Sequence, residues 1–152
     1  MHARIESNPA FSYVHHHEKQ FRGKTVALSV FVVEDSPAVR NIMLEQLNDL
    51  PNVVCSGHAD TELTAIEDLR GSACDVLILD IKLKAGTGIG VLRAIAAEDW
   101  SKPPATRIIF SNYTDHAFRT LALSLGATHF FDKTLDFPTL LSLVSKLAST
   151  AH

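Results

Sequence analysis

The stretch Ala27-Leu28-Ser29-Val30-Phe31-Val32-Val33-Glu34-Asp35-Ser36-Pro37 decides the fold of this chain. It is an apolar run that ends on two acids and passes directly into the start of a helix. Ser36 is a residue type that caps helix N-termini, and Pro37 suits the first helical turn. Apolar residues then follow at helical spacing, at Val39, Ile42, Met43, Leu47 and Leu50. A strand followed at once by a helix predicts a βα unit.

The same alternation recurs along the rest of the chain. Four further apolar runs predict strands over Val53–Cys55, Val76–Leu79, Ile108–Phe110 and Phe130-Phe131. Helical spacing predicts helices around Glu62–Leu69 and Ile89–Ala97, behind Asp115 with a C-cap at Gly126, and from the cap Asp136 to Leu147. Repeated βα units predict an α/β, flavodoxin-like, doubly wound fold, whose five-stranded parallel sheet has strand order 2-1-3-4-5 and carries five helices on its two faces.

Length and composition indicate one domain. The 152 residues are 46% hydrophobic and 20% charged, which is enough apolar material for one packed core. We assign residues 1–24 to a polar N-terminal extension that is expected to be flexible, 25–149 to the folded domain and 150–152 to a tail. The extension contains His15, His16 and His17, which we interpret as part of an unstructured polar tail.

Charge and hydropathy exclude several classes of partner. The formal net charge of −3 argues against direct binding of nucleic acid or of an anionic membrane. The apolar run Val26–Val33 is too short to span a bilayer, and His, Arg and Glu occupy the first residues, where a signal peptide would be apolar. Cys55 and Cys74 match no metal or redox spacing and are expected to be buried thiols. We therefore expect a cytoplasmic protein.

Polar residues follow most of the predicted strands. Glu34 and Asp35 follow the first strand, Asp80 the third, Ser111 the fourth and Lys133 the fifth, whereas Ser56–Ala59 after the second contain His58 but no carboxylate. Parallel strands end at the same edge of a sheet, so these side chains should converge. Three carboxylates that close repel one another unless a divalent cation lies among them, and their oxygen ligands suit Mg²⁺.

Such a cluster can support phosphoryl transfer. A carboxylate beside Mg²⁺ can attack phosphorus and form an aspartyl phosphate. A nearby ammonium and a hydroxyl can then stabilise the transferring oxygens, and Lys133 and Ser111 are the candidates.

These residues together resemble the receiver domains of two-component response regulators. The resemblance rests on Glu34-Asp35-Ser36-Pro37, Leu77-Ile78-Leu79-Asp80, Gly88, Ile109-Phe110-Ser111 and Phe130-Phe131-Asp132-Lys133, in order between Val26 and Ala148. It implies phosphorylation of Asp80 by a histidine kinase or a histidine phosphotransfer protein. It also implies that Asp35, Asp80 and the Lys82 carbonyl hold Mg²⁺, with Glu34 acting through water. Ser111 and Lys133 would bind the phosphoryl group, and Phe130 occupies the aromatic position that rotates inward on activation in this family.

Some residues depart from the family pattern. Lys84 and Thr134 stand where many receivers have proline, which puts the conformation of two loops in question. Gly86, Gly88 and Gly90 do not have the spacing of a nucleotide-binding loop, and we interpret them as a flexible loop. Lys82 and Tyr113, two residues beyond Asp80 and Ser111, should flank the path of the attacking water and so lengthen the life of the aspartyl phosphate.

Three other functions compete with a phosphorylated switch. A haloacid dehalogenase-type hydrolase needs a second carboxylate two residues after the nucleophile, where this chain has Lys82. A flavin protein would need to bind a phosphate in the first βα loop, where Glu34 and Asp35 would repel it. A receiver-like adaptor that works by protein contact without phosphorylation stays open as the alternative.

We therefore expect a stand-alone phosphoacceptor signalling domain that is not an enzyme, with self-catalysed phosphoryl uptake and autodephosphorylation. The sequence ends at His152, just after the fifth predicted helix, so output should pass through an unidentified downstream protein rather than through DNA. The predicted output face is built from the fourth helix, fifth strand and fifth helix. A homodimer of the phosphorylated form is left open.

Overall fold

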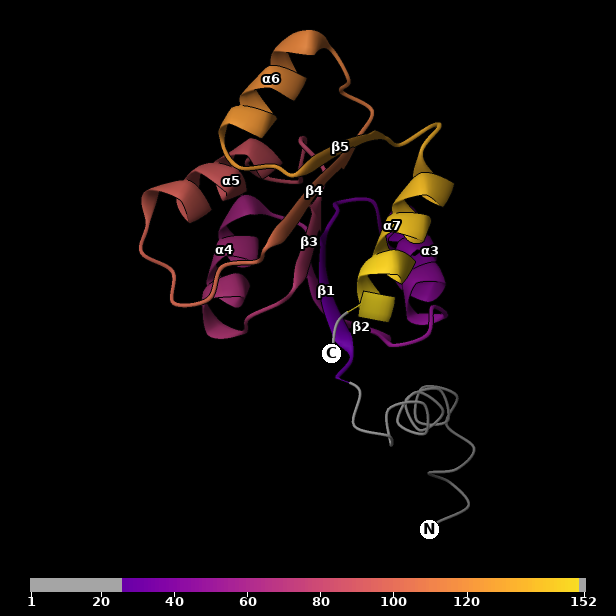
Figure 1. The fold of residues 1–152 in the computed structure, drawn as a ribbon. Helices are drawn as coiled ribbons and strands as arrows, with labels where there is room; N and C mark the ends of the chain where they lie inside the picture. The colour runs from indigo at the N-terminus through magenta and orange to yellow at the C-terminus, as the bar shows by residue number, and fades with distance from the viewer. Residues whose placement is uncertain (1–25, 151–152) are drawn as a thin grey trace.

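A five-stranded parallel sheet forms the centre of the computed structural model, which describes residues 26–150 (Figure 1). Its strands are β1 (Leu28–Val33), β2 (Val53–Ala59), β3 (Val76–Leu79), β4 (Thr106–Ser111) and β5 (His129–Asp132). They pair in the order β2-β1-β3-β4-β5, with every pairing parallel, as predicted. The extension 1–24, its three histidines and the last two residues lie outside the described residues.

Helices cover both faces of the sheet, which confirms the doubly wound α/β fold. α4 (Glu62–Gly71), α5 (Gly88–Ala97) and α6 (His116–Ser124) lie on one face, and α3 (Pro37–Asn48) and α7 (Phe137–Thr150) lie on the other (Figure 1). α7 runs one residue past the predicted domain limit at 149. None of the described helices is long and apolar enough to cross a membrane.

Successive side chains along a strand point to opposite faces of the sheet, so the core is divided into two layers. On β4, Ile109 packs into the layer beneath α4, α5 and α6, while Ile108 and Phe110 pack into the layer beneath α3 and α7. All four residues of β3 are buried, as expected for a central strand covered on both faces. The central strands are thereby fixed in register, and the ends of β1, β3 and β4 are held beside one another.

The second strand is longer than predicted. The sequence suggested Val53–Cys55 with His58 in the following loop, but β2 continues to Ala59 and His58 pairs with Val32. Gly57, Ser56 and His58 have weak strand preferences, so hydrogen bonding along β1 decides the conformation. A register shift between Val30 and Phe31 leaves Ser56 unpaired within this strand.

Side-chain N-caps begin three of the described helices, at Ser36, Thr61 and Thr87. The Ser36 hydroxyl accepts a hydrogen bond from the Val39 amide, and Gly126 has the left-handed φ of +102° that the predicted C-cap requires. Asp115 occupies the N-cap position of α6 but makes no side-chain cap hydrogen bond. The Asp136 carboxylate instead accepts from the Asp132 amide, at 2.8 Å, and so ties the end of β5 to the start of α7.

The glycines after β3 do not form one flexible loop, contrary to our interpretation. Gly88 and Gly90 lie in the first turn of α5, and only Gly86 lies in the loop, with φ of +77°. A side-chain Cβ on Gly88 would lie 2.0 Å from the Asp80 carbonyl oxygen. Glycine is therefore required at position 88 because the helix starts against the backbone of Asp80.

The two cysteines are free thiols that differ in burial. Cys74 is buried, as expected, whereas Cys55 is only partly buried because it lies on the edge strand β2. Burial raises the pKa of each thiol to about 12, so both thiols are protonated at neutral pH. A protonated thiol is a weak nucleophile, which agrees with a packing role for these two residues.

Candidate functional site

The structure brings four of the predicted site residues together at the carboxyl ends of the strands. Glu34 and Asp35 follow β1, Asp80 follows β3, and Lys133 follows β5. β1 and β3 are neighbours in the sheet, whereas β4 separates β3 from β5. The long Lys133 side chain spans that extra strand and reaches both buried acids, Glu34 and Asp80.

Lys133 is the centre of a compact charged cluster. Its Nζ atom lies 2.7 Å from Glu34 Oε1 and 2.5 Å from Asp80 Oδ2. The side chains are 12% exposed for Lys133, 2% for Glu34 and 8% for Asp80, so water screens these contacts poorly. The ammonium therefore fixes the positions of both carboxylates.

Backbone amides complete the hydrogen bonding of the two buried acids. The Ile81 amide donates to Asp80 Oδ1 at 2.6 Å, and the Ser36 amide donates to Glu34 Oε2 at 3.0 Å. Each buried carboxylate thus has one oxygen facing Lys133 and the other facing the backbone. This arrangement holds both side chains in one orientation.

Burial and charge act in opposite directions on the ionisation of this cluster. Burial raises the pKa of Glu34, and the hydrogen bond from Lys133 offsets part of that increase. Burial by itself would lower the pKa of Lys133, but its hydrogen bonds with Asp80 and Glu34 outweigh burial, so this pKa lies above the usual value. Lys133 is accordingly a cation at neutral pH.

The carboxylates offer ligands for a divalent cation. Glu34, Asp35 and Asp80 each have a carboxylate oxygen, and these three oxygens lie within 4.8 Å of one another. Lys133 contributes one positive charge against these three acids, and Asp35 forms no ion pair with another described residue. The donor set is hard oxygen with excess negative charge, which fits Mg²⁺.

Ser111 lies at the same edge of the sheet, but its hydroxyl makes no hydrogen bond to Lys133 or Asp80 within the described part of the chain. Its side chain is fully buried, and its Oγ accepts a hydrogen bond of 3.1 Å from the Tyr113 amide. The hydroxyl is therefore bonded to the β4–α6 loop. A turn of this hydroxyl toward Asp80 would break that bond.

Phe130 is half-buried and is covered by a residue that the sequence did not single out. The guanidinium carbon of Arg119 lies 4.6 Å from the centroid of the Phe130 ring. The Nε of Arg119 also donates to the Thr114 carbonyl, at 3.0 Å. Arg119 thus links the aromatic ring of β5 to the loop that follows Ser111. No spacing rule connects a residue on α6 with the next strand, so only the fold shows this contact.

The loop after Asp80 is joined to the loop after β2. The Lys84 amide donates to the Asp60 carbonyl at 3.1 Å, and the Glu62 amide donates to the Ala85 carbonyl at 2.9 Å. Proline has no amide hydrogen, so a proline at position 84 could not make the first of these bonds. The departure from the family pattern at Lys84 thus supplies a hydrogen bond between the two loops.

Glu62 is a second residue that sequence reasoning missed. It lies in the first turn of α4, and its Oε1 accepts a hydrogen bond of 2.9 Å from the amide of Thr87, the N-cap of α5. One carboxylate therefore lies near the N-termini of two helices, where negative charge is favourable. The part of the loop that leads into α5 is held in place as a result.

Comparison with known proteins agrees with this fold and geometry. The family model of the response regulator receiver domain matches residues 30–145. The chain belongs to the response regulator receiver family of two-component signalling systems.

Relatives and solved structures are consistent with this assignment. The chain is 34% identical over 108 residues to protein-glutamate methylesterase/protein-glutamine glutaminase 3 of Leptospira interrogans, a match that covers 70% of this chain and 30% of that protein. It thus spans less than a third of the length of the protein-glutamate methylesterases that it matches. The response regulator domain of Thermotoga maritima CheB superposes with a TM-score of 0.69 at 25% identity, covering 82% of this chain and 96% of that one. A two-component response regulator of the LuxR family from Aurantimonas sp. SI85-9A1 shares the fold, with a TM-score of 0.71 at 22% identity, covering 81% and 86%.

Proposed function

We propose that this chain is a cytoplasmic signalling switch that accepts a phosphoryl group on Asp80 from a histidine kinase or a histidine phosphotransfer protein. The observation that carries the proposal is the position of Asp80, whose carboxylate is shared between the Lys133 ammonium and the Ile81 amide. Such a carboxylate is oriented before phosphorus arrives, which lowers the cost of reaching an in-line geometry. The chain is a phosphoacceptor in this role, and it catalyses its own phosphorylation and dephosphorylation.

Each residue of the cluster has a separate task in this proposal. Asp80 is the nucleophile, and Lys133 stabilises charge on the phosphoryl oxygens. Asp35, Asp80 and the Lys82 carbonyl would hold Mg²⁺ directly, with Glu34 acting through water, and the bound ion would neutralise the charge that gathers on the phosphoryl group. Ser111 would leave the Tyr113 amide and bind a phosphoryl oxygen.

The same change at Ser111 would reach Phe130. Both residues border the β4–α6 loop, since Ser111 is bonded to Tyr113 and Phe130 lies under Arg119, which is bonded to Thr114. We infer that phosphorylation shifts this loop and the Phe130 ring together and so changes the face of α6, β5 and α7 that a downstream protein would contact. The phosphorylated form could dimerise through the same face.

The adaptor that works without phosphorylation remains the second candidate, but no observation of this structure favours it. An adaptor has no need for three acids and a lysine gathered at one edge, because burying such a cluster costs desolvation energy.

Incubation of the whole chain with acetyl phosphate and Mg²⁺, followed by intact-mass measurement, tests the proposal. We expect one added phosphoryl group in the wild type and none in Asp80→Asn. Undiminished labelling of Asp80→Asn would refute the assignment of the acceptor. A wild type that takes up no phosphoryl group from either acetyl phosphate or a phosphorylated histidine donor would favour the adaptor.

A further inference from the structure

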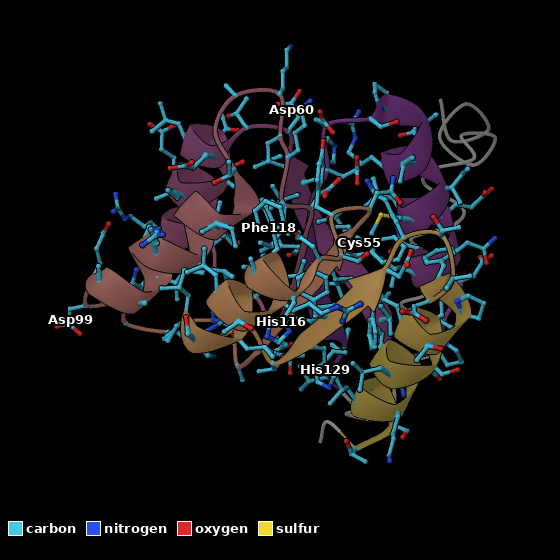
Figure 2. The ribbon with its side chains drawn as sticks, turned by 90° about the horizontal axis from the view of Figure 1, so that it is seen from above. Cys55, Asp60, Asp99, His116, Phe118 and His129 are labelled. Atoms are coloured by element: carbon cyan, nitrogen blue, oxygen red, sulfur yellow. The ribbon has the colours of Figure 1, made fainter. Side chains whose placement is uncertain are left out.

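A hollow of about 450 Å³ opens between α5, α6 and the loop after β3, and we call it the α5–α6 hollow. Phe118 lies on the side of α6 that faces α5 (Figure 2). The hollow is lined mainly by apolar side chains, among them Ile81, Ile89, Phe118 and Leu121. Ile81 and Ile89 are buried and belong to the core beneath α5, so a ligand in the hollow would contact the core itself.

Two cations border this apolar surface. Lys82 comes from the loop after β3 and Arg93 from α5, and both are exposed. Neither forms a salt bridge with another described residue, and no acid is among the described residues that line the hollow. An apolar group flanked by negative charge therefore complements the hollow in both polarity and charge.

The hollow is also connected to the phosphoacceptor. The Ile81 amide donates to Asp80 Oδ1 at 2.6 Å. Tyr113, which lines the hollow and is 41% exposed, donates its amide to Ser111 Oγ at 3.1 Å and packs edge-on against Phe118. A change at Asp80 or Ser111 thus acts directly on residues that line the hollow.

The N-terminal extension is a poor match for this hollow. Residues 1–25 contain four cations against two carboxylates, namely Arg4, Lys19, Arg22 and Lys24 against Glu6 and Glu18. A segment with net positive charge would meet Lys82 and Arg93 with like charge, which is unfavourable. The complementary occupant is therefore a segment of another protein.

We propose that the α5–α6 hollow is a docking site for a partner segment that carries a leucine or aromatic side chain flanked by Asp or Glu. The apolar side chain enters between Ile89 and Phe118, and the carboxylates pair with Lys82 and Arg93. This surface shares α6 with the face of α6, β5 and α7 discussed above, but it lies on the side of α6 that faces α5. Its affinity depends on the state of Asp80 through Ile81 and Tyr113, and this dependence rests on the proposed phosphorylation.

The test is titration of the ¹⁵N-labelled whole chain with a synthetic peptide in which Leu and Phe are flanked by Glu, and with a matched peptide in which Lys replaces Glu. We expect the acidic peptide to shift amide signals of residues 81–93 and 113–121. Arg93→Glu should weaken binding about tenfold, because it places like charge beside the ligand. Lys146→Glu makes the same change of charge on exposed α7 and should leave the affinity unchanged.

Three results would overturn the docking site: equal affinity for the two peptides, shifts confined to β5 and α7, or unchanged affinity in Arg93→Glu. A dimer in sedimentation experiments that depends on Arg93 would assign the hollow to a second copy and also overturn it. Beryllofluoride with Mg²⁺ should change the peptide affinity of the wild type but not that of Asp80→Asn. If the peptide affinity does not change, intact-mass measurement of phosphoryl uptake shows whether the hollow is uncoupled from Asp80 or whether Asp80 is not phosphorylated at all.

Discussion

Lys133 Nζ and Asp80 Oδ2 lie 2.5 Å apart, although 53 positions separate the two residues in sequence. The same ammonium contacts Glu34, so one cation holds Asp80, the proposed nucleophile, and a neighbouring acid together. Replacing Lys133 with Met would leave the two buried acids without this counter-charge and remove a donor to the phosphoryl oxygens.

Lys133→Met should therefore slow phosphoryl uptake from acetyl phosphate by at least about tenfold, or about 1.4 kcal/mol of barrier. Time-resolved intact-mass measurement gives the rate, and circular dichroism checks that the variant is folded. Lys146→Met on the exposed surface of α7 is the control for loss of a lysine. A rate equal to that of the wild type would mean that Lys133 only positions the acids.

The acidic cluster predicts that Mg²⁺ stabilises the folded chain. At a Mg²⁺ concentration of about a hundred times its dissociation constant, binding would add about 2.7 kcal/mol to the free energy of unfolding. Asp35→Ala should lose most of this effect, whereas Asp49→Ala, which removes an exposed acid beyond α3, should retain it. Melting temperatures with Mg²⁺ and with EDTA decide the matter. An equal magnesium-dependent shift in both variants would place the ion elsewhere.

The hydrogen bond of the Lys84 amide predicts that replacing Lys84 with proline, which many receivers have at this position, destabilises the fold. Lys84→Pro removes the hydrogen bond to the Asp60 carbonyl and should lower the free energy of unfolding by about 1 kcal/mol. Lys84→Ala keeps the amide and should have little effect. Urea denaturation of the two variants measures the difference. If proline is as stable as alanine at this position, the hydrogen bond contributes nothing measurable.

Arg119 and Phe130 should be energetically coupled. The single variants Arg119→Leu and Phe130→Leu, with the double variant, form a cycle in which we expect about 0.5–1 kcal/mol of interaction. Amide exchange of residues 111–133, with and without beryllofluoride, should also differ between Arg119→Leu and the wild type. Additive stabilities and identical exchange would show that Arg119 is not part of the link between the loop and the ring.

Lys82 and Tyr113 are predicted to lengthen the life of the aspartyl phosphate. Both side chains line the α5–α6 hollow, which Ile81 joins to Asp80, and we expect them to hinder the approach of water in line with the leaving carboxylate. Lys82→Asn and Tyr113→Ala should each shorten the lifetime several-fold, or by about 1 kcal/mol of barrier. Lys84→Asn, two residues further along the same loop, is the control. Equal rates of phosphate release in all variants would contradict the shielding argument.

Much of the fold could be predicted because local signals agree with one another. Apolar runs such as Val76–Leu79 and the cap at Ser36 each match the element that forms. The end of β2 could not be predicted, because Ser56, Gly57 and His58 become a strand only by pairing with β1. Local preference thus fails where a neighbouring strand decides the conformation.

The acidic residues and the lysine of the site were predictable for a similar reason. Each follows a strand, and parallel strands end at one edge, so Glu34, Asp35, Asp80 and Lys133 could be placed together from the sequence alone. The contacts of Arg119, Glu62 and the Lys84 amide were not predictable. They join loops and helices that are distant in sequence and leave no periodic pattern.

The contact between Gly88 and the backbone of Asp80 limits how this chain can change by mutation. The obstacle to a side chain at position 88 is a carbonyl oxygen, which cannot turn aside as a side chain can. Even alanine would have to displace either the first turn of α5 or the peptide group of Asp80. A single methyl group at position 88 would thus move either the start of α5 or the backbone of Asp80, and this glycine should tolerate substitution poorly.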